Sequence, residues 1–77
     1  MNYNVIPIDR FKKEAKRLLK KYSSLKGELL QLERQLSDSP NLGISLGHNV
    51  YKIRLAIESK GKGKSGGARV ITYLVTE

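Results

Sequence analysis

Two apolar stripes at helical spacing, with only a short polar break between them, constrain the fold of this chain more than any other feature of its sequence. The first stripe recurs every three or four residues from Phe11 to Tyr22, and the second runs from Leu25 to Leu36. This spacing places each stripe on one face of an α-helix. Because the break is so short, the two predicted helices must pack against each other as an antiparallel hairpin.

Polar residues at the ends of the stripes predict where the helices begin and end. Asp9 precedes the first stripe and is a candidate N-cap, because its carboxylate can accept hydrogen bonds from the free amides of the first turn. Ser24 can cap the second helix in the same way. Asp38, Ser39 and Pro40 then end that helix.

Strand patterns flank the helical hairpin on both sides. Residues 3–8 form a short apolar segment, and residues 50–58 alternate between apolar and polar side chains. Residues 68–76 are rich in β-branched and aromatic side chains, which favour strands. Residues 41–49 contain two glycines and indicate a loop. The predicted order is therefore β-α-α-β-β in a single α+β domain of residues 1–77, with the antiparallel helical hairpin packed on one face of a small, mainly antiparallel sheet.

The last predicted strand, residues 68–76, has apolar side chains on both of its faces. This pattern is typical of a strand that lies inside a sheet and is covered on both sides. Nothing later in the sequence is available to cover it. We therefore expect an open apolar edge that pairs with another chain, as in a homodimer or a strand-exchanged form.

The chain contains 15 Lys and Arg against 7 Asp and Glu, a net charge of +8, and the excess lies in two blocks. Residues 9–22 hold seven basic and two acidic side chains, and residues 50–77 hold six basic and two acidic ones. Such a charge favours an anionic partner, either a nucleic acid or an acidic protein surface. The candidate nucleic-acid contacts are lysines of the first helix and of the glycine-rich loop: Lys12, Lys13, Lys16, Lys20, Lys60, Lys62 and Lys64. For the helical lysines, a solvated surface is the alternative interpretation.

Several kinds of chemistry are excluded by what the composition lacks. There is no Cys, which excludes disulfides, thiolate zinc sites and cysteine nucleophiles and fits a reducing compartment. His48 is the single histidine, and beside Gly47 we interpret it as a turn residue rather than a general base. We expect no metal and no cofactor. No apolar run approaches the roughly 20 residues of a membrane span, and the N-terminus lacks the pattern of a signal peptide, so we expect a cytoplasmic protein with no membrane partner.

Gly61, Gly63 and Gly66 match the GxGxxG pattern of dinucleotide-binding loops. That function requires a helix directly after the loop and an acidic residue about 20 positions later. A β-branched strand follows here instead. We therefore interpret the segment as the tip of a hairpin.

Lys52, Arg54 and Arg69 are the candidate catalytic residues. Lys52 and Arg54 share one face of the predicted strand, and Arg69 opens the next strand, which antiparallel pairing can bring beside them. Three cations on a rigid sheet can hold a phosphate and stabilise the charge that develops on it during phosphoryl transfer. An ordinary solvated sheet face is the alternative interpretation.

These segments resemble the RelE/ParE superfamily of bacterial toxins. Residues 11–21, with the leucine-rich helix after them, resemble its N-terminal half, and residues 47–54 and 68–73 resemble its central hairpin. The resemblance implies a β-α-α-β-β-β fold and the toxin half of a toxin–antitoxin pair, with a cognate antitoxin protein as partner. RelE-like members enter the ribosomal A site and cleave mRNA by attack of a ribose 2′-OH on the adjacent phosphate, so the ribosome and mRNA are further implied partners.

The resemblance also implies roles for individual residues. Lys52 and Arg54 match two basic residues of one family strand, and Arg69 matches the arginine that opens the next. Their implied roles are substrate positioning, activation of the 2′-OH and stabilisation of the phosphate, without a pair of histidines. ParE-like relatives poison DNA gyrase instead. The alternative function is therefore a non-catalytic binding module, either gyrase-directed or limited to binding its antitoxin.

The chain departs from the family pattern at its end. The family continues into a further strand with another arginine and, in many members, a tyrosine, whereas the sequence ends at Glu77. These roles have no counterpart here, and Tyr73 does not take them over. We therefore expect an endoribonuclease of impaired activity, whose exposed strand edge pairs with a second copy or with an antitoxin segment.

Overall fold

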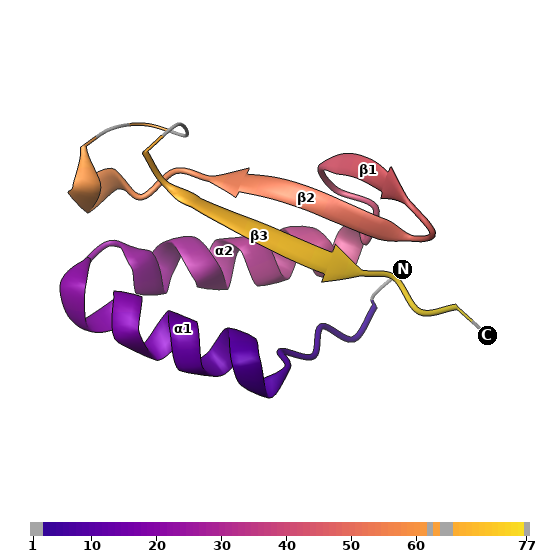
Figure 1. Cartoon of the computed structure of the whole chain (residues 1–77), viewed down its shortest axis with the longest axis horizontal. Helices are drawn as coiled ribbons and strands as arrows, with labels where there is room; N and C mark the ends of the chain where they lie inside the picture. Colours follow the sequence, from indigo (N-terminus) through magenta and orange to yellow (C-terminus); the bar gives the residue numbers. More distant parts are fainter. Residues whose placement is uncertain (1–2, 62, 64–65, 77) are drawn as a thin grey trace.

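The computed structural model describes residues 3–61, 63 and 66–76 and shows two helices on one side of a three-stranded sheet (Figure 1). In chain order the elements are α1 (Asp9–Lys21), α2 (Leu25–Asp38), β1 (Ile44–Gly47), β2 (Val50–Leu55), the short 3₁₀ helix η1 (Glu58–Lys60) and β3 (Ala68–Tyr73). The strands pair antiparallel in the order β1-β2-β3. This arrangement confirms the predicted α+β class. No helix in the described part of the chain is both long and apolar enough to cross a membrane.

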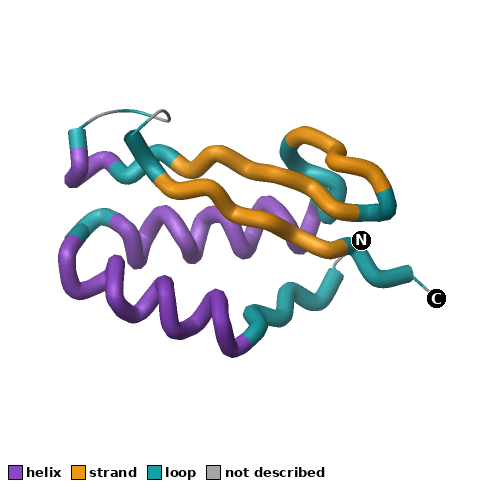
Figure 2. Tube along the Cα trace, in the orientation of Figure 1, coloured by secondary structure: helices purple, strands orange, loops and turns teal. Residues whose placement is uncertain are grey.

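The third strand of the sheet comes from a different segment than predicted. Residues 3–8 form an irregular segment and no strand (Figure 2). At the beginning of this segment, the Tyr3 N–H donates to the Ser37 carbonyl of α2 at 2.9 Å. Pro7 has no N–H to donate to a strand ladder, and the Tyr3 N–H is bonded to α2 rather than to a strand. Residues 41–49, predicted as a loop, instead contain β1.

A two-residue turn joins β1 to β2. Gly47 pairs with Val50, and the residues between them, His48 and Asn49, have φ angles of 52° and 62°. Type I′ turns require a positive φ at both central positions, and Asn and His adopt it more readily than most residues. His48 is therefore a turn residue, in agreement with its interpretation from the sequence.

β2 ends earlier than the predicted strand 50–58. After Leu55 the chain turns into η1, and the Glu58 N–H donates to the Glu28 carboxylate of α2 at 2.8 Å. Ser24 Oγ donates to the same carboxylate at 3.1 Å and accepts the Ser59 N–H at 2.9 Å. These hydrogen bonds tie the turn between the helices to the end of β2, and they hold residues 58 and 59 away from the sheet.

The predicted helix caps also form differently. Asp9 is the first residue of α1 rather than its N-cap, and Ile8 occupies the cap position. Ser24 does occupy the N-cap position of α2, but its side chain caps no amide of that helix, because it is bonded to the Glu28 carboxylate and to Ser59. α2 ends at Asp38, as predicted.

The core lies between α2 and the sheet. Leu32 and Leu36 of α2 form a buried cluster with Ile53 of β2 and Val70 of β3. Ile53 and Val70 are direct cross-strand partners, so the register of the hairpin sets the centre of the core. α1 contributes no buried residue, and its side chains, such as Phe11, are at most half-buried. The helical hairpin therefore covers the sheet mainly through α2.

β3 is an edge strand, although its sequence pattern is typical of a central one. Among the described residues it pairs with β2 alone, and it ends at Tyr73 rather than at residue 76. Val70 faces the helices, whereas Ile71 and Tyr73 are exposed on the other side. β2 takes the central position because β1 pairs with its second edge.

Candidate functional site on the open face of the sheet

The face of the sheet that points away from the helices, here called the open face, follows from strand alternation. Ile53 is buried against α2, so its neighbours Lys52 and Arg54 point to the opposite side. The register assigns their cross-strand partners to the same side. The open face consists of Ile44, Val50, Lys52, Arg54, Arg69, Ile71 and Tyr73.

Arg54 and Arg69 are direct cross-strand partners. The Leu74 N–H donates to the Asn49 carbonyl at 2.8 Å. Since hydrogen-bonded and non-hydrogen-bonded pairs alternate along an antiparallel ladder, the two arginines form a non-hydrogen-bonded pair, in which Cα atoms lie about 4.5 Å apart and side chains are closest. Two exposed guanidinium groups therefore extend from one point of the sheet, although like charges directly opposite each other destabilise a strand pair.

Lys52 completes a cluster of three cations. It lies two residues from Arg54 on β2, about 7 Å along the strand, and its partners on the two neighbouring strands are Ile44 and Ile71. Lys52 is half-buried, because isoleucines on both sides can cover its aliphatic stem while the ammonium group stays at the surface. The three predicted catalytic residues thus share one face.

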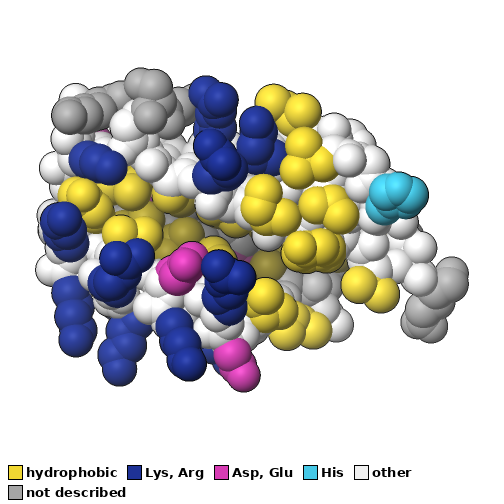
Figure 3. Space-filling view, in the orientation of Figure 1, with side chains coloured by type: hydrophobic (Ala, Val, Ile, Leu, Met, Phe, Trp, Pro, Cys, Tyr) yellow, Lys and Arg dark blue, Asp and Glu magenta, His cyan; other side chains and the backbone are white. Residues whose placement is uncertain are grey.

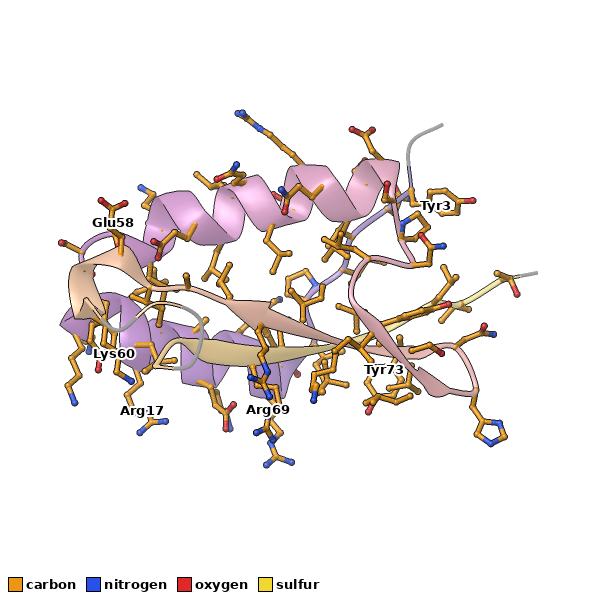
Figure 4. All side chains as sticks on the ribbon, turned by 90° about the horizontal axis from the view of Figure 1, so that it is seen from above. Tyr3, Arg17, Glu58, Lys60, Arg69 and Tyr73 are labelled. Carbon is orange, nitrogen blue, oxygen red and sulfur yellow. The ribbon has the colours of Figure 1, made fainter. Side chains whose placement is uncertain are left out.

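The lysines predicted to bind nucleic acid lie elsewhere. Four of them are exposed on α1, on the helix side of the sheet: Lys12, Lys13, Lys16 and Lys20. Lys60 is the last residue of η1 (Figure 4), and its Nζ lies 5.6 Å from the centre of the ring of Tyr22, the residue that follows α1. Lys62 and Lys64 lie outside the described residues. Figure 3 shows one group of basic side chains over α1 and another above the sheet, with hydrophobic surface between them. The chain therefore presents two basic surfaces rather than one.

The open face also has an apolar half that the sequence pattern did not reveal. Ile44, Ile71 and Tyr73 are 59%, 41% and 67% exposed. Ile44 was missed because its segment was predicted as a loop, although the alternation Ile-Ser-Leu before the turn residues Gly-His-Asn is a signal for a hairpin strand. The open face is thus cationic toward the Arg69 end of β3 and apolar toward the Tyr73 end (Figure 4).

This face can bind an anion but offers no acid–base pair of the usual kind. All of its charged members are cations, and His48 lies in the β1–β2 turn, at the opposite end of β2 from Arg54. Nowhere in the described residues do three His, Asp or Glu side chains gather into a possible metal site. Two shallow depressions beside Tyr3 include none of the open-face cations. The chemistry that remains is the binding of negative charge and the stabilisation of charge that develops during a reaction.

Comparison of the chain with family models, with curated proteins and with solved structures finds no match.

Proposed function

We propose that the chain is the toxin of a toxin–antitoxin module and acts in the cytoplasm as a ribosome-dependent mRNA endoribonuclease of the RelE type. The observation that supports this most is the direct pairing of Arg54 with Arg69 on an open sheet face, with Lys52 two residues away. On a sheet face with no binding function, two like charges opposite each other would only lower stability, because they destabilise the strand pair. A bound phosphodiester would offset that cost by placing one negative charge between the two guanidinium groups, and the second negative charge that develops during the reaction would offset it further.

The proposed reaction is a transesterification of the RNA backbone. The ribose 2′-oxygen attacks the adjacent phosphorus as its proton passes to water, and the bond from phosphorus to the 5′-oxygen breaks as that oxygen takes a proton from water. The products are a 2′,3′-cyclic phosphate and a 5′-hydroxyl. We assign stabilisation of the charged phosphoryl oxygens to Arg54 and Arg69, since guanidinium groups can donate paired hydrogen bonds to phosphate. We assign positioning and activation of the 2′-hydroxyl to Lys52.

The proposal includes a protein partner that suppresses the toxin. An antitoxin that covers the open face with acidic side chains would neutralise its cations and exclude RNA from them. No cofactor is needed for this chemistry, because the nucleophile belongs to the substrate.

The test is cleavage of mRNA in a reconstituted translation system, with and without ribosomes. Arg69→Ala is expected to lower the cleavage rate about 100-fold, because it removes one donor that stabilises developing charge. Lys52→Ala should lower the rate by less. Arg34→Ala removes the same charge from α2, on the other side of the sheet, and should leave the rate unchanged. Absence of cleavage by the unmodified chain, or equal loss in the Arg34 variant, would contradict the proposal.

A non-catalytic binding module is the alternative, either a ParE-like toxin directed at gyrase or a module that only binds its antitoxin. The apolar half of the open face, Ile44, Ile71 and Tyr73, favours this alternative because exposed apolar patches are typical of protein-binding surfaces. In that case mRNA stays intact in the presence of the protein. Inhibition of gyrase in a DNA supercoiling assay then separates the two versions.

A further inference from the structure

The two edges of the sheet are protected to different degrees. β1 has four residues, and its register with β2 shifts between Ser45 and Gly47, which interrupts this edge. β3 has six residues in regular register, with no proline, glycine or bulge. Among the described residues, β3 pairs only with β2. β3 is therefore the edge to which another strand can add.

The hydrogen bond from Leu74 to Asn49 fixes which backbone groups of β3 face outward. The Leu74 N–H points to the β2 side, so by alternation the N–H and C=O groups of residues 70 and 72 point there as well. Those of Arg69, Ile71 and Tyr73 point to the free edge, and their side chains lie on the open face. An added strand would bond to these three residues and extend the open face by one strand.

The apolar side of α1, which lies below β3 in Figure 1, is only partly covered. Phe11, Ala15 and Leu18 are half-buried, and Leu19 is 38% exposed. Figure 3 shows hydrophobic side chains between the basic side chains of α1 and the sheet. In a strand added to β3, the side chains on the helix side of the sheet would cover these partly exposed side chains of α1, which are here called the seam.

Charge decides which kind of strand fits this edge. Arg69 stands near the start of β3 with Arg54 beside it, and residues 9–22 below hold seven basic and two acidic side chains. A second copy of the chain, with its own net charge of +8, would bring like charges together at the edge. An acidic segment would be attracted to the same place.

We propose that β3 is the docking edge for an extended acidic segment of a partner protein, which adds antiparallel as a fourth strand. The segment has a carboxylate opposite Arg69, apolar side chains opposite Ile71 and Tyr73, and apolar side chains over the seam to α1. This interface specifies how the suppressing partner of the proposed function would dock and in that respect rests on that function, although its backbone contacts are the outward groups of β3 and involve no bound phosphate.

Two synthetic peptides test the proposal on the full chain. One alternates Val and Thr and ends in two glutamates, and the other ends in two lysines instead. Only the acidic peptide should bind, and its affinity should fall as salt rises. In amide hydrogen exchange, protection should appear at Arg69, Ile71 and Tyr73 on binding, while residues 70 and 72 are protected with and without peptide. Equal binding of both peptides, or protection that appears only outside β3, would overturn the proposal.

Variants of the edge separate strand addition from other occupants. Ile71→Pro removes an outward N–H without removing a bond to β2, so it should weaken peptide binding about fivefold or more. Ile71→Ala, which keeps the N–H, is the matched control and should weaken it less. If the proline variant fails to fold, Arg69→Glu replaces it, and this variant should release the acidic peptide and bind the lysine peptide. A dimer of the unmodified chain that tightens with salt and excludes the acidic peptide would overturn the proposal in favour of self-association.

Discussion

At the scale of single residues, alanine substitution is expected to have opposite effects on the free energy of unfolding at two glycines. A Cβ added at Gly67 would overlap the Leu55 carbonyl oxygen, because the chain passes directly over the end of β2 as it enters β3, whereas a Cβ at Gly27 on α2 meets no atom within 4 Å. Gly67→Ala is expected to lower the free energy of unfolding by about 1–3 kcal/mol through overpacking. Gly27→Ala should raise it by about 1 kcal/mol through helix propensity. Urea unfolding of both variants measures the two changes, and a shared sign would contradict this account of Gly67.

At the scale of elements, the β2–β3 hairpin contains an electrostatic conflict. Arg54 and Arg69 oppose each other directly, whereas Lys52 has Ile44 and Ile71 as its partners. Arg54→Thr removes the repulsion and adds a good strand former, so it should raise the free energy of unfolding by about 0.2–1 kcal/mol. The same variant should lose RNA cleavage. Lys52→Thr is the control and should bring no comparable gain in stability, because Lys52 has no like charge opposite it. Chemical unfolding measures the stability of both variants, and the cleavage assay measures their activity. A loss of stability in the Arg54 variant would show that the pair is not strained.

At the scale of the whole molecule, the core is small. The radius of gyration is 12.5 Å, against about 11.5 Å expected for a compact domain of this length. Six apolar side chains are buried among the described residues, and none of them comes from α1. Stability therefore depends on few contacts. Leu32→Ala is expected to lower the free energy of unfolding by about 2–5 kcal/mol, a large part of the roughly 4–12 kcal/mol typical of this chain length.

Leu30→Ala is the matched control for Leu32→Ala, because Leu30 lies on the same helix but is 50% exposed. It should cost less than about 1 kcal/mol. Thermal and urea unfolding of both variants check the difference. Similar costs at the two positions would mean that α2 does not pack on the sheet through the Leu32 side.

The sequence predicted those features that depend on local periodicity. The stripes at helical spacing predicted α1 and α2, and the alternation around Ile53 predicted which side of β2 is buried, so it also placed Lys52 and Arg54 together on the opposite side. The roles proposed for these cations remain predictions. The predicted strand boundaries were less accurate. Residues 3–8, which contain Pro7, were predicted as a strand but lie outside the sheet. β1 was missed because its short segment lies between Gly43 and His48 and includes Gly47, a composition typical of a loop.

By itself, then, the sequence determined the two helices, the buried side of the central strand and the cationic character of the face opposite to it, because each is encoded within a few neighbouring residues. Only the tertiary structure decided that Arg69 lies directly opposite Arg54, that Ile44 joins the same face and that β3 is left at an edge. Those features depend on the register and order of strands, and register is set by turns and by packing between residues far apart in the chain. The type I′ turn at His48 and Asn49 sets the register between β1 and β2. The buried Ile53–Val70 pair sets the register between β2 and β3.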